Sequence, residues 1–227
     1  MVNPVVDLPL TERAPRRALI KRLNKRWLGL AGVVVIAALV TTFLWWPKSP
    51  PNLGVGNHLV TSGVAAAWHA GQLVVLVRHE ERCDRSSNPC LGPPDGLTVA
   101  GTVSATAIGK AFQALGMANT DVLSSPATRT AQTSLFMFGK AELSPGPLAI
   151  CGRAMGEELL PHKQAGRNLV LVTHRACIAD FEAALGYKHA AGAEYGSALF
   201  VQVLPDGKFK ALGIMNSKDW PAAIKQL

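Results

Sequence analysis

Residues 73–81, Leu-Val-Val-Leu-Val-Arg-His-Glu-Glu, decide the fold of this 227-residue chain. Five apolar, mostly β-branched residues predict a buried parallel strand, and Arg78 and His79 follow it directly. Ligands of open α/β sheets bind at the carboxyl ends of the strands. At that position a neutral imidazole can attack a phosphoryl group while a guanidinium holds the phosphate oxygens. The alternative is that both side chains are plain polar groups at a strand end, because so short a pattern is weak alone.

Two later segments repeat this design. The apolar run 168–173 predicts a second strand, and it ends in His174. Residues 121–125 predict a third strand, after which Pro126 predicts a helix start and places Arg129 in the first turn. A cation near a helix N-terminus is disfavoured unless it faces an anion, and a bound phosphate would be such an anion. Otherwise Arg129 is an ordinary exposed helix residue.

The remaining pattern predicts a three-layer α/β domain with a mostly parallel sheet and helices on both faces. Residues 58–71 predict a short helix with Val60, Val64, Ala67 and Trp68 on one face. Residues 82–96 predict a loop over the end of the first strand. Thr98 predicts the N-cap of a crossover helix that ends at Gly116, with an apolar stripe of Val99, Val103, Ile108, Phe112 and Leu115. Two alternating segments around Pro205-Asp206-Gly207 predict a hairpin at the sheet edge.

The N-terminal region predicts a membrane anchor. Residues 28–46 contain no charged side chain for nineteen positions, enough to span most of a bilayer core. Trp27 lies at one end of this run and Trp45-Trp46 at the other, as expected for membrane interfaces. A cleaved signal peptide is the alternative, but the basic segment before the run is long and no small-residue cleavage site follows it. A buried core helix is a third interpretation.

Charge and composition give the predicted topology and the domain boundaries. Seven Arg and Lys residues against two acids give residues 1–27 a net charge of +5, which leaves +3 of the total of +8 for the rest. This distribution argues against a general nucleic-acid-binding surface and predicts a cytoplasmic tail at 1–27. We expect an anchor at 28–46, a Pro- and Gly-rich linker at 47–57 and one domain at 58–227. The protein is then a single-pass inner-membrane protein with its domain in the periplasm.

Four motifs in this order resemble the histidine phosphatase (phosphoglycerate mutase-like) superfamily. They are Leu-Val-Arg78-His79, Gly96-Leu97-Thr98-x-x-Gly101, Ser124-Ser125-Pro126-x-x-Arg129-Thr130-x-Gln132-Thr133 and Val172-Thr173-His174. The resemblance covers about residues 58–215. It implies that His79 is the phosphorylated nucleophile, that Arg78 and Arg129 bind the phosphate, and that His174 stabilises the transferring phosphoryl group. Many members have glycine where this chain has Glu80, so a large side chain stands where the backbone normally approaches closely.

A narrower resemblance is to the lipopolysaccharide core heptose(II)-phosphate phosphatases. It rests on Arg78-His79-x-Glu81-Arg82-Cys83-Asp84-Arg85-Ser86-x-Asn88-x-Cys90-Leu91, on Cys151-Gly152 and on Thr173-His174-x-x-Cys177. The resemblance implies that a phosphorylated envelope sugar or lipopolysaccharide is the substrate. Composition and spacing do not indicate this substrate.

The four cysteines independently predict an oxidising compartment. None has zinc-ligand spacing, and all follow the exporting segment, so we expect two disulfides, for which three pairings exist. We favour Cys83 with Cys90, a local bridge across the loop after the nucleophile, and Cys151 with Cys177, which lies three residues after His174. Four buried free thiols are the alternative.

The proton donor to the leaving group is sought among carboxylates near the pocket. Glu157, Glu158, Glu81 and Asp84 are the candidates, and we favour Glu157 slightly because relatives carry their acid in this part of the chain. Each is otherwise an ordinary surface carboxylate. Neither CxxC nor HxxxH occurs, so we expect no metal and no cofactor.

We therefore predict a membrane-anchored periplasmic phosphatase that hydrolyses a phosphomonoester of a lipopolysaccharide core sugar through a phosphohistidine. A phosphatase of protein phosphohistidine or phosphotyrosine is the runner-up. A relative that binds phosphorylated ligands without catalysis is the other alternative.

Overall fold

The computed structural model describes residues 25–44, 48–144, 151–152 and 155–225. The chain forms two compact units, Met1–Trp46 and Pro47–Leu227. In the first unit helix α1 covers Lys25–Leu44, and its side chains from 27 to 42 are exposed. Within the described part of the chain, no helix combines the length and the hydropathy needed to cross a membrane. The predicted span 28–46 continues into residues that are not described, and so does the basic tail, so both stay predictions.

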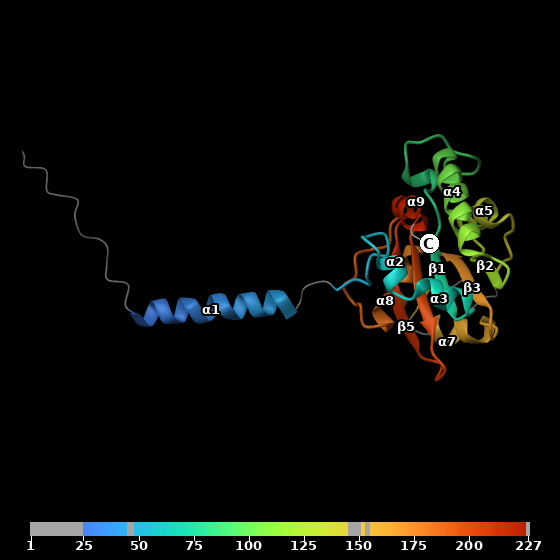
Figure 1. Ribbon diagram of the computed structural model, residues 1–227. Coiled ribbons are helices and arrows are strands. Elements are labelled where there is room, and N and C mark those ends of the chain that lie inside the picture. The colour runs from blue at the N-terminus through green and yellow to red at the C-terminus, as the bar shows by residue number, and fades with distance from the viewer. Residues whose placement is uncertain (1–24, 45–47, 145–150, 153–154, 226–227) are drawn as a thin grey trace, which may run out of the picture. The chain divides into compact units, whose positions relative to one another are not determined.

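The second unit is built on one five-stranded sheet with the order β2-β3-β1-β4-β5 (Figure 1). Strands β1 (Leu73–Arg78), β2 (Thr120–Ser124) and β3 (Asn168–Thr173) are parallel. The hairpin strands β4 (Ala198–Val203) and β5 (Phe209–Met215) run antiparallel to β1 and to each other. The predicted mostly parallel sheet is therefore a mixed sheet. The loop before β4 lies at the carboxyl end of β1, where Arg78 N donates to Ser197 O, so β4 begins beside that end and runs in the opposite direction.

Helices cover both faces of this sheet, as predicted. On β1, Val75 and Val77 belong to one core cluster together with Phe112 of helix α4 (Val99–Leu115). Val74 and Leu76 belong to a second cluster together with Phe181 of helix α8 (Arg175–Ala184). Alternate residues of a strand point to opposite faces, so these two clusters form the two interfaces of a three-layer domain. The first cluster also draws on α5 (Thr128–Phe138) and α9 (Trp220–Ile224), and the second on α7 (Met155–Leu159).

Helix α4 begins and ends as predicted, but its apolar stripe differs. The hydroxyl of Thr98 accepts a hydrogen bond from Gly101 N at 2.9 Å, which confirms the N-cap. Val99 and Val103 are 46% and 66% exposed, whereas the buried stripe starts at Ala105. The first turn pairs instead with the preceding loop, since Val99 N donates to Pro89 O.

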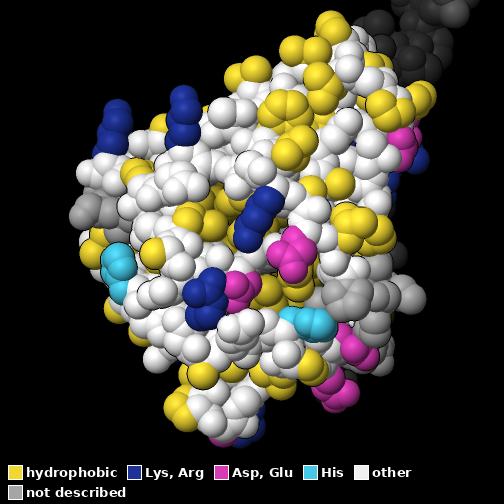
Figure 2. Space-filling model, turned by 90° about the vertical axis from the view of Figure 1, so that its right-hand side faces the viewer, with side chains coloured by type: hydrophobic (Ala, Val, Ile, Leu, Met, Phe, Trp, Pro, Cys, Tyr) yellow, Lys and Arg dark blue, Asp and Glu magenta, His cyan; other side chains and the backbone are white. Residues whose placement is uncertain are grey.

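On the face of the molecule shown in Figure 2, Lys and Arg side chains stand singly among acidic and apolar ones.

Part of the expected linker belongs to the domain. Pro51 O accepts a hydrogen bond from Ile214 N at 2.8 Å, and Leu53 N donates to Ile214 O at 2.9 Å, so this segment extends the sheet beside β5. Leu53 is 1% exposed and lies in the first core cluster. The predicted helix 58–71 is two helices, α2 (His58–Thr61) and α3 (Val64–His69), because the chain turns at Gly63, which has φ +80°. Val60, expected on the apolar face, is exposed.

Candidate active site

The carboxyl ends of the central strands bring the four predicted phosphate-handling residues together. Arg78 of β1 pairs with Thr173 of β3, so His79 and His174 leave the sheet side by side, with ring centroids 5.5 Å apart. Arg129 lies in the first turn of α5, and its Nη2 is 3.3 Å from His174 Nδ1. The site is formed where adjacent parallel strands end, the position at which α/β sheets bind ligands.

Hydrogen bonds assign different tautomers to the two histidines. His79 Nδ1 lies 2.8 Å from the carbonyl oxygen of Glu80. A carbonyl only accepts, so Nδ1 carries the proton and Nε2 keeps a free lone pair. His174 Nδ1 faces a guanidinium, which only donates, so the proton of neutral His174 is on Nε2. His79 Nε2 therefore has a lone pair available for nucleophilic attack, whereas His174 Nε2–H can donate a hydrogen bond.

Both rings are held neutral. The pKa of His79 is lowered to about 3, chiefly by burial; the hydrogen bond to Glu80 O opposes this shift, and the charges of Arg129, His174 and Arg78 add to it. Burial, then Arg129 and Arg82, lower the pKa of His174 to about 4. Because only a neutral imidazole is a nucleophile, His79 is ready to react without first losing a proton at neutral pH.

Two guanidiniums supply the positive charge of the site. Arg78 Nη1 donates to Ala193 O at 2.6 Å, and Arg78 Cζ lies 3.9 Å from the ring centroid of Tyr195. The Nε atoms of Arg78 and Arg129 are buried and have no hydrogen-bond partner among the described residues. Buried unpaired donors are costly, and a phosphate oxygen is an acceptor that would satisfy them. The pKa of each arginine is lowered, first by burial, which marks them as desolvated cations.

Tyr195 is a site residue that the sequence interpretation missed. Its ring centroid lies 5.7 Å from that of His79, and its face covers Arg78. The segment that carries it reaches the site through the main chain, since Arg78 N donates to Ser197 O at 2.9 Å. No motif surrounds Tyr195 in the sequence, so only the path of the chain before β4 reveals its role.

The Glu80 side chain is buried against helix α4. It is 3% exposed, its Oε1 accepts a hydrogen bond from Ser104 Oγ at 2.7 Å, and its N donates to Thr133 Oγ1 at 3.0 Å. Gly196, with φ +67°, makes room for it, because a Cβ there would overlap the Glu80 carboxylate and Ile108. A glycine more than a hundred residues away in the sequence thus provides the space that the Glu80 side chain occupies. Burial raises the pKa of Glu80.

The loop after His79 contains the predicted bridge Cys83–Cys90. Glu81 Oε2 accepts from Asn88 Nδ2 at 2.8 Å and from Thr98 Oγ1 at 2.7 Å, and these bonds lower the pKa of Glu81. Asp84 pairs with Arg82, which lowers the pKa of Asp84. Both carboxylates near the loop are therefore ionised at neutral pH.

The second predicted disulfide, Cys151–Cys177, is also present. Cys177 belongs to α8 and is fully buried in the second core cluster, one turn after His174. Both pairings favoured from the sequence are confirmed.

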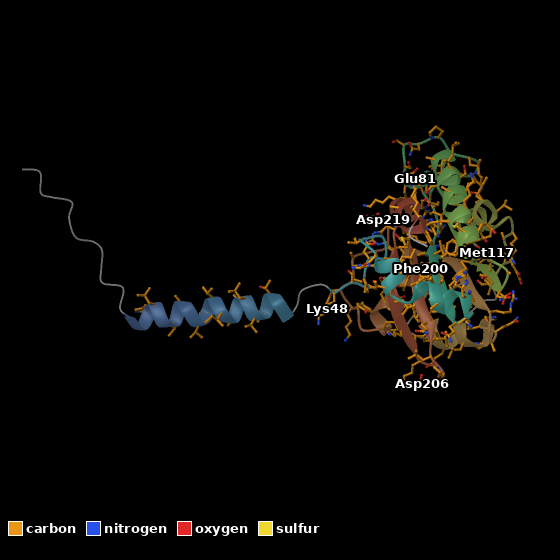
Figure 3. The ribbon with its side chains drawn as sticks, viewed as in Figure 1. Lys48, Glu81, Met117, Phe200, Asp206 and Asp219 are labelled. Carbon is orange, nitrogen blue, oxygen red and sulfur yellow. A yellow bond between two sulfur atoms is a disulfide. The ribbon has the colours of Figure 1, made fainter. Side chains whose placement is uncertain are left out.

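The favoured proton donor, Glu157, does not reach this site. It belongs to α7, together with Glu158, and a Cβ on the preceding Gly156 would lie 3.1 Å from the Phe209 ring. Phe209 is the first residue of β5 and pairs with Val203. Val203 N donates a hydrogen bond to the carbonyl oxygen of Gln72, the residue directly before β1. The six residues of β1 separate this end of the sheet from His79 by roughly 20 Å, at about 3.3 Å per residue. In Figure 3, Glu81 and Asp206, in the β4–β5 turn, lie at opposite ends of the domain. The prediction failed because chain order does not determine the sheet end at which a connecting helix packs.

Comparisons with known proteins find relatives in sequence and in fold. No protein-family model matches the chain. A lipopolysaccharide core heptose(II)-phosphate phosphatase from Salmonella newport (strain SL254) is 37% identical over 162 residues, 68% of this chain and 76% of that protein. A protein of the same name from Salmonella typhi is 36% identical over 162 residues, with the same coverage.

Solved structures share the fold at low identity. The protein histidine phosphatase SixA complexed with tungstate has a TM-score of 0.52 at 17% identity and covers 65% of this chain and 98% of its own. A phosphoserine phosphatase mutant from Entamoeba histolytica in complex with phosphoserine has a TM-score of 0.50 at 15% identity, with the same coverage of 65% and 98%.

Proposed function

This chain belongs to the family of the lipopolysaccharide core heptose(II)-phosphate phosphatases, and we propose from this that it removes phosphate from a heptose of the lipopolysaccharide core. The observation that carries the proposal is the pair of complementary histidines, His79 with a free Nε2 and His174 with an Nε2–H, between two arginines. Nucleophile, donor and cationic clamp are the parts that phosphoryl transfer requires.

The reaction proceeds in two displacements. In the first, His79 Nε2 attacks phosphorus, a P–N bond forms, and the P–O bond to the sugar breaks. The departing oxygen takes up a proton and leaves as the free hydroxyl. In the second, water attacks the phosphohistidine, the P–N bond breaks, and inorganic phosphate is released together with a proton. Arg78, Arg129 and His174 Nε2–H stabilise the charge on the phosphoryl oxygens in both steps.

A phosphate-release assay on purified lipopolysaccharide core oligosaccharide tests the substrate. We expect release by the wild-type protein and a loss of at least about a thousandfold in His79→Ala, which lacks the nucleophile. His162→Ala is the matched control, because His162 lies in the 3-10 helix Leu160–His162 that follows α7, away from the site, and it should retain full activity. Release from phosphohistidine or phosphotyrosine peptides but not from the core oligosaccharide would contradict the proposed substrate.

Trapping of the intermediate tests the mechanism. Mass spectrometry after a rapid quench without acid should find phosphate on His79. Phosphate on His174 alone would reverse the two assignments, and activity without any labelled histidine would exclude the two-step route.

We further propose that residues 28–46 anchor the protein in the inner membrane and that the domain works in the periplasm. The support is the nineteen-residue uncharged run, the basic cluster before it and the tryptophans at its ends. Protease added to spheroplasts should digest the domain and spare residues 1–27. Protection of the domain until the membrane is permeabilised would contradict this topology.

A further inference from the structure

A cavity of about 390 Å³ lies between α4 and α9, apart from the phosphate site. Its volume is within the range of roughly 300–1,000 Å³ in which small-molecule sites occur. Ile108 and Trp220, which are 1% and 2% exposed, line it, so it reaches the hydrophobic core. The remaining lining residues are Ser104, Ala107, Lys110, Ala111, Ser217, Pro221, Ile224 and Lys225.

The cavity lining carries positive charge without negative charge. Lys110 and Lys225 are exposed, and no ion pair of either is found among the described residues. No acidic side chain lines the cavity. Two acids lie near the cavity without lining it: Asp219 Oδ2 accepts from Asn216 Nδ2 at 3.3 Å, and the buried Glu80 carboxylate accepts from the lining Ser104 Oγ at 2.7 Å. A ligand at this position would therefore meet an apolar interior and a cationic rim.

Polar groups inside the cavity are few. Ser104 Oγ donates to Glu80 Oε1 and lies 3.0 Å from Ser217 Oγ, so both hydroxyls already have partners. Trp220 Nε1 is buried and has no partner among the described residues. A long apolar body with one anionic group is the ligand that such a lining favours, because burial of the apolar body is favourable and only the charged end needs polar partners.

We propose that this cavity binds an amphiphilic anion, a single acyl chain with a carboxylate or phosphate head. The chain lies against Ile108 and Trp220, and the head faces Lys110 and Lys225. This site is independent of the proposed phosphatase reaction, because none of its lining residues handles the phosphoryl group.

Photolabelling of the full-length protein in lipid nanodiscs tests the site. The probe is decanoic acid with a diazirine in its chain, and labelled peptides are identified by mass spectrometry. We expect saturable labelling within residues 104–111 and 217–225. Unlabelled decanoate should compete with the probe, and decanol, which lacks the charge, should compete about fivefold less well.

Variants of exposed lining residues distinguish labelling in the cavity from labelling by general contact with lipid. Ala107→Trp should lower labelling about tenfold by filling the cavity, whereas Ala107→Ser should leave it unchanged. Lys110→Glu combined with Lys225→Glu should lower it at least about fivefold, and Lys140→Glu, on the turn after α5, should not. Labelling confined to residues 25–44, equal competition by decanol, or undiminished labelling of folded Ala107→Trp protein would each overturn the proposal. Phosphatase activity enters none of these readouts, so its absence would leave the result on the cavity intact.

Discussion

Acidification should destabilise this protein through His79. The pKa of His79 is about 3 in the folded protein, because burial disfavours the imidazolium, and about 6.5 in an unfolded chain. As the pH falls below 6.5, His79 becomes protonated in the unfolded chain, whereas in the folded protein it stays neutral until about pH 3. The unfolded state then binds more protons, so the free energy of unfolding decreases with falling pH.

The size of this effect follows from the two pKa values. Between pH 7.5 and pH 5 the contribution of His79 to the free energy of unfolding falls by about 2 kcal/mol. The reason is that pH 5 lies roughly 1.5 pH units below the unfolded pKa, and each of these units lowers the contribution by about 1.36 kcal/mol. Because pH 5 lies well above the folded pKa, the figure depends almost entirely on the unfolded value. His79 is only 4% exposed, so solvent screening does not reduce it appreciably.

Urea unfolding at both pH values, for the wild type and His79→Gln, measures the effect. We expect the wild type to lose about 2 kcal/mol more than the variant on acidification. Taking this difference removes the contributions of other groups. Glu182 is one of them: burial raises its pKa to about 7, so its effect on stability has the opposite sign. His162→Gln should behave like the wild type. An equal loss in the wild type and in His79→Gln would refute the reasoning.

Four further predictions concern the site and the domain boundary. Tyr195→Leu should raise KM about fivefold by releasing the arginine that its ring covers, and Tyr195→Phe should restore the wild-type value in steady-state assays. Glu157→Gln should keep kcat within about twofold, because this carboxylate lies at the other end of the sheet; a large loss would contradict its placement. Cys83→Ser should lower the free energy of unfolding by about 2–3 kcal/mol, measured in urea, and a stability equal to the wild type would show that the bridge contributes nothing. A fragment beginning at His58 should be less stable than one beginning at residue 48 by at least about 2 kcal/mol, because it lacks the buried Leu53, and equal melting temperatures would contradict the docked segment.

The order of strands and helices could be predicted from local patterns. The apolar strands before His79 and His174 and the N-cap at Thr98 all lie where periodicity and capping rules place them. The direction of β4 could not be predicted, because the pattern of a hairpin is the same whether it joins the sheet parallel or antiparallel to its neighbour. The docking of Leu53 was also missed, because one leucine in a Pro-rich segment gives no periodic signal.

The site was predictable where its residues follow strands and unpredictable where they come from loops. His79, His174 and Arg129 meet because parallel neighbouring strands end at the same edge. Glu157 was wrongly favoured because its distance from the pocket depends on where α7 packs.

The sequence by itself determined the chemical groups of this protein: two histidines and two arginines in a fixed order, four cysteines, and the apolar strands that precede the histidines. Those properties are local, because strand periodicity and side-chain chemistry need no knowledge of distant residues. Only the tertiary structure decided that Tyr195 covers Arg78, and that Gly196 makes room for Glu80. These contacts join residues more than a hundred positions apart, and close packing of the whole domain sets them.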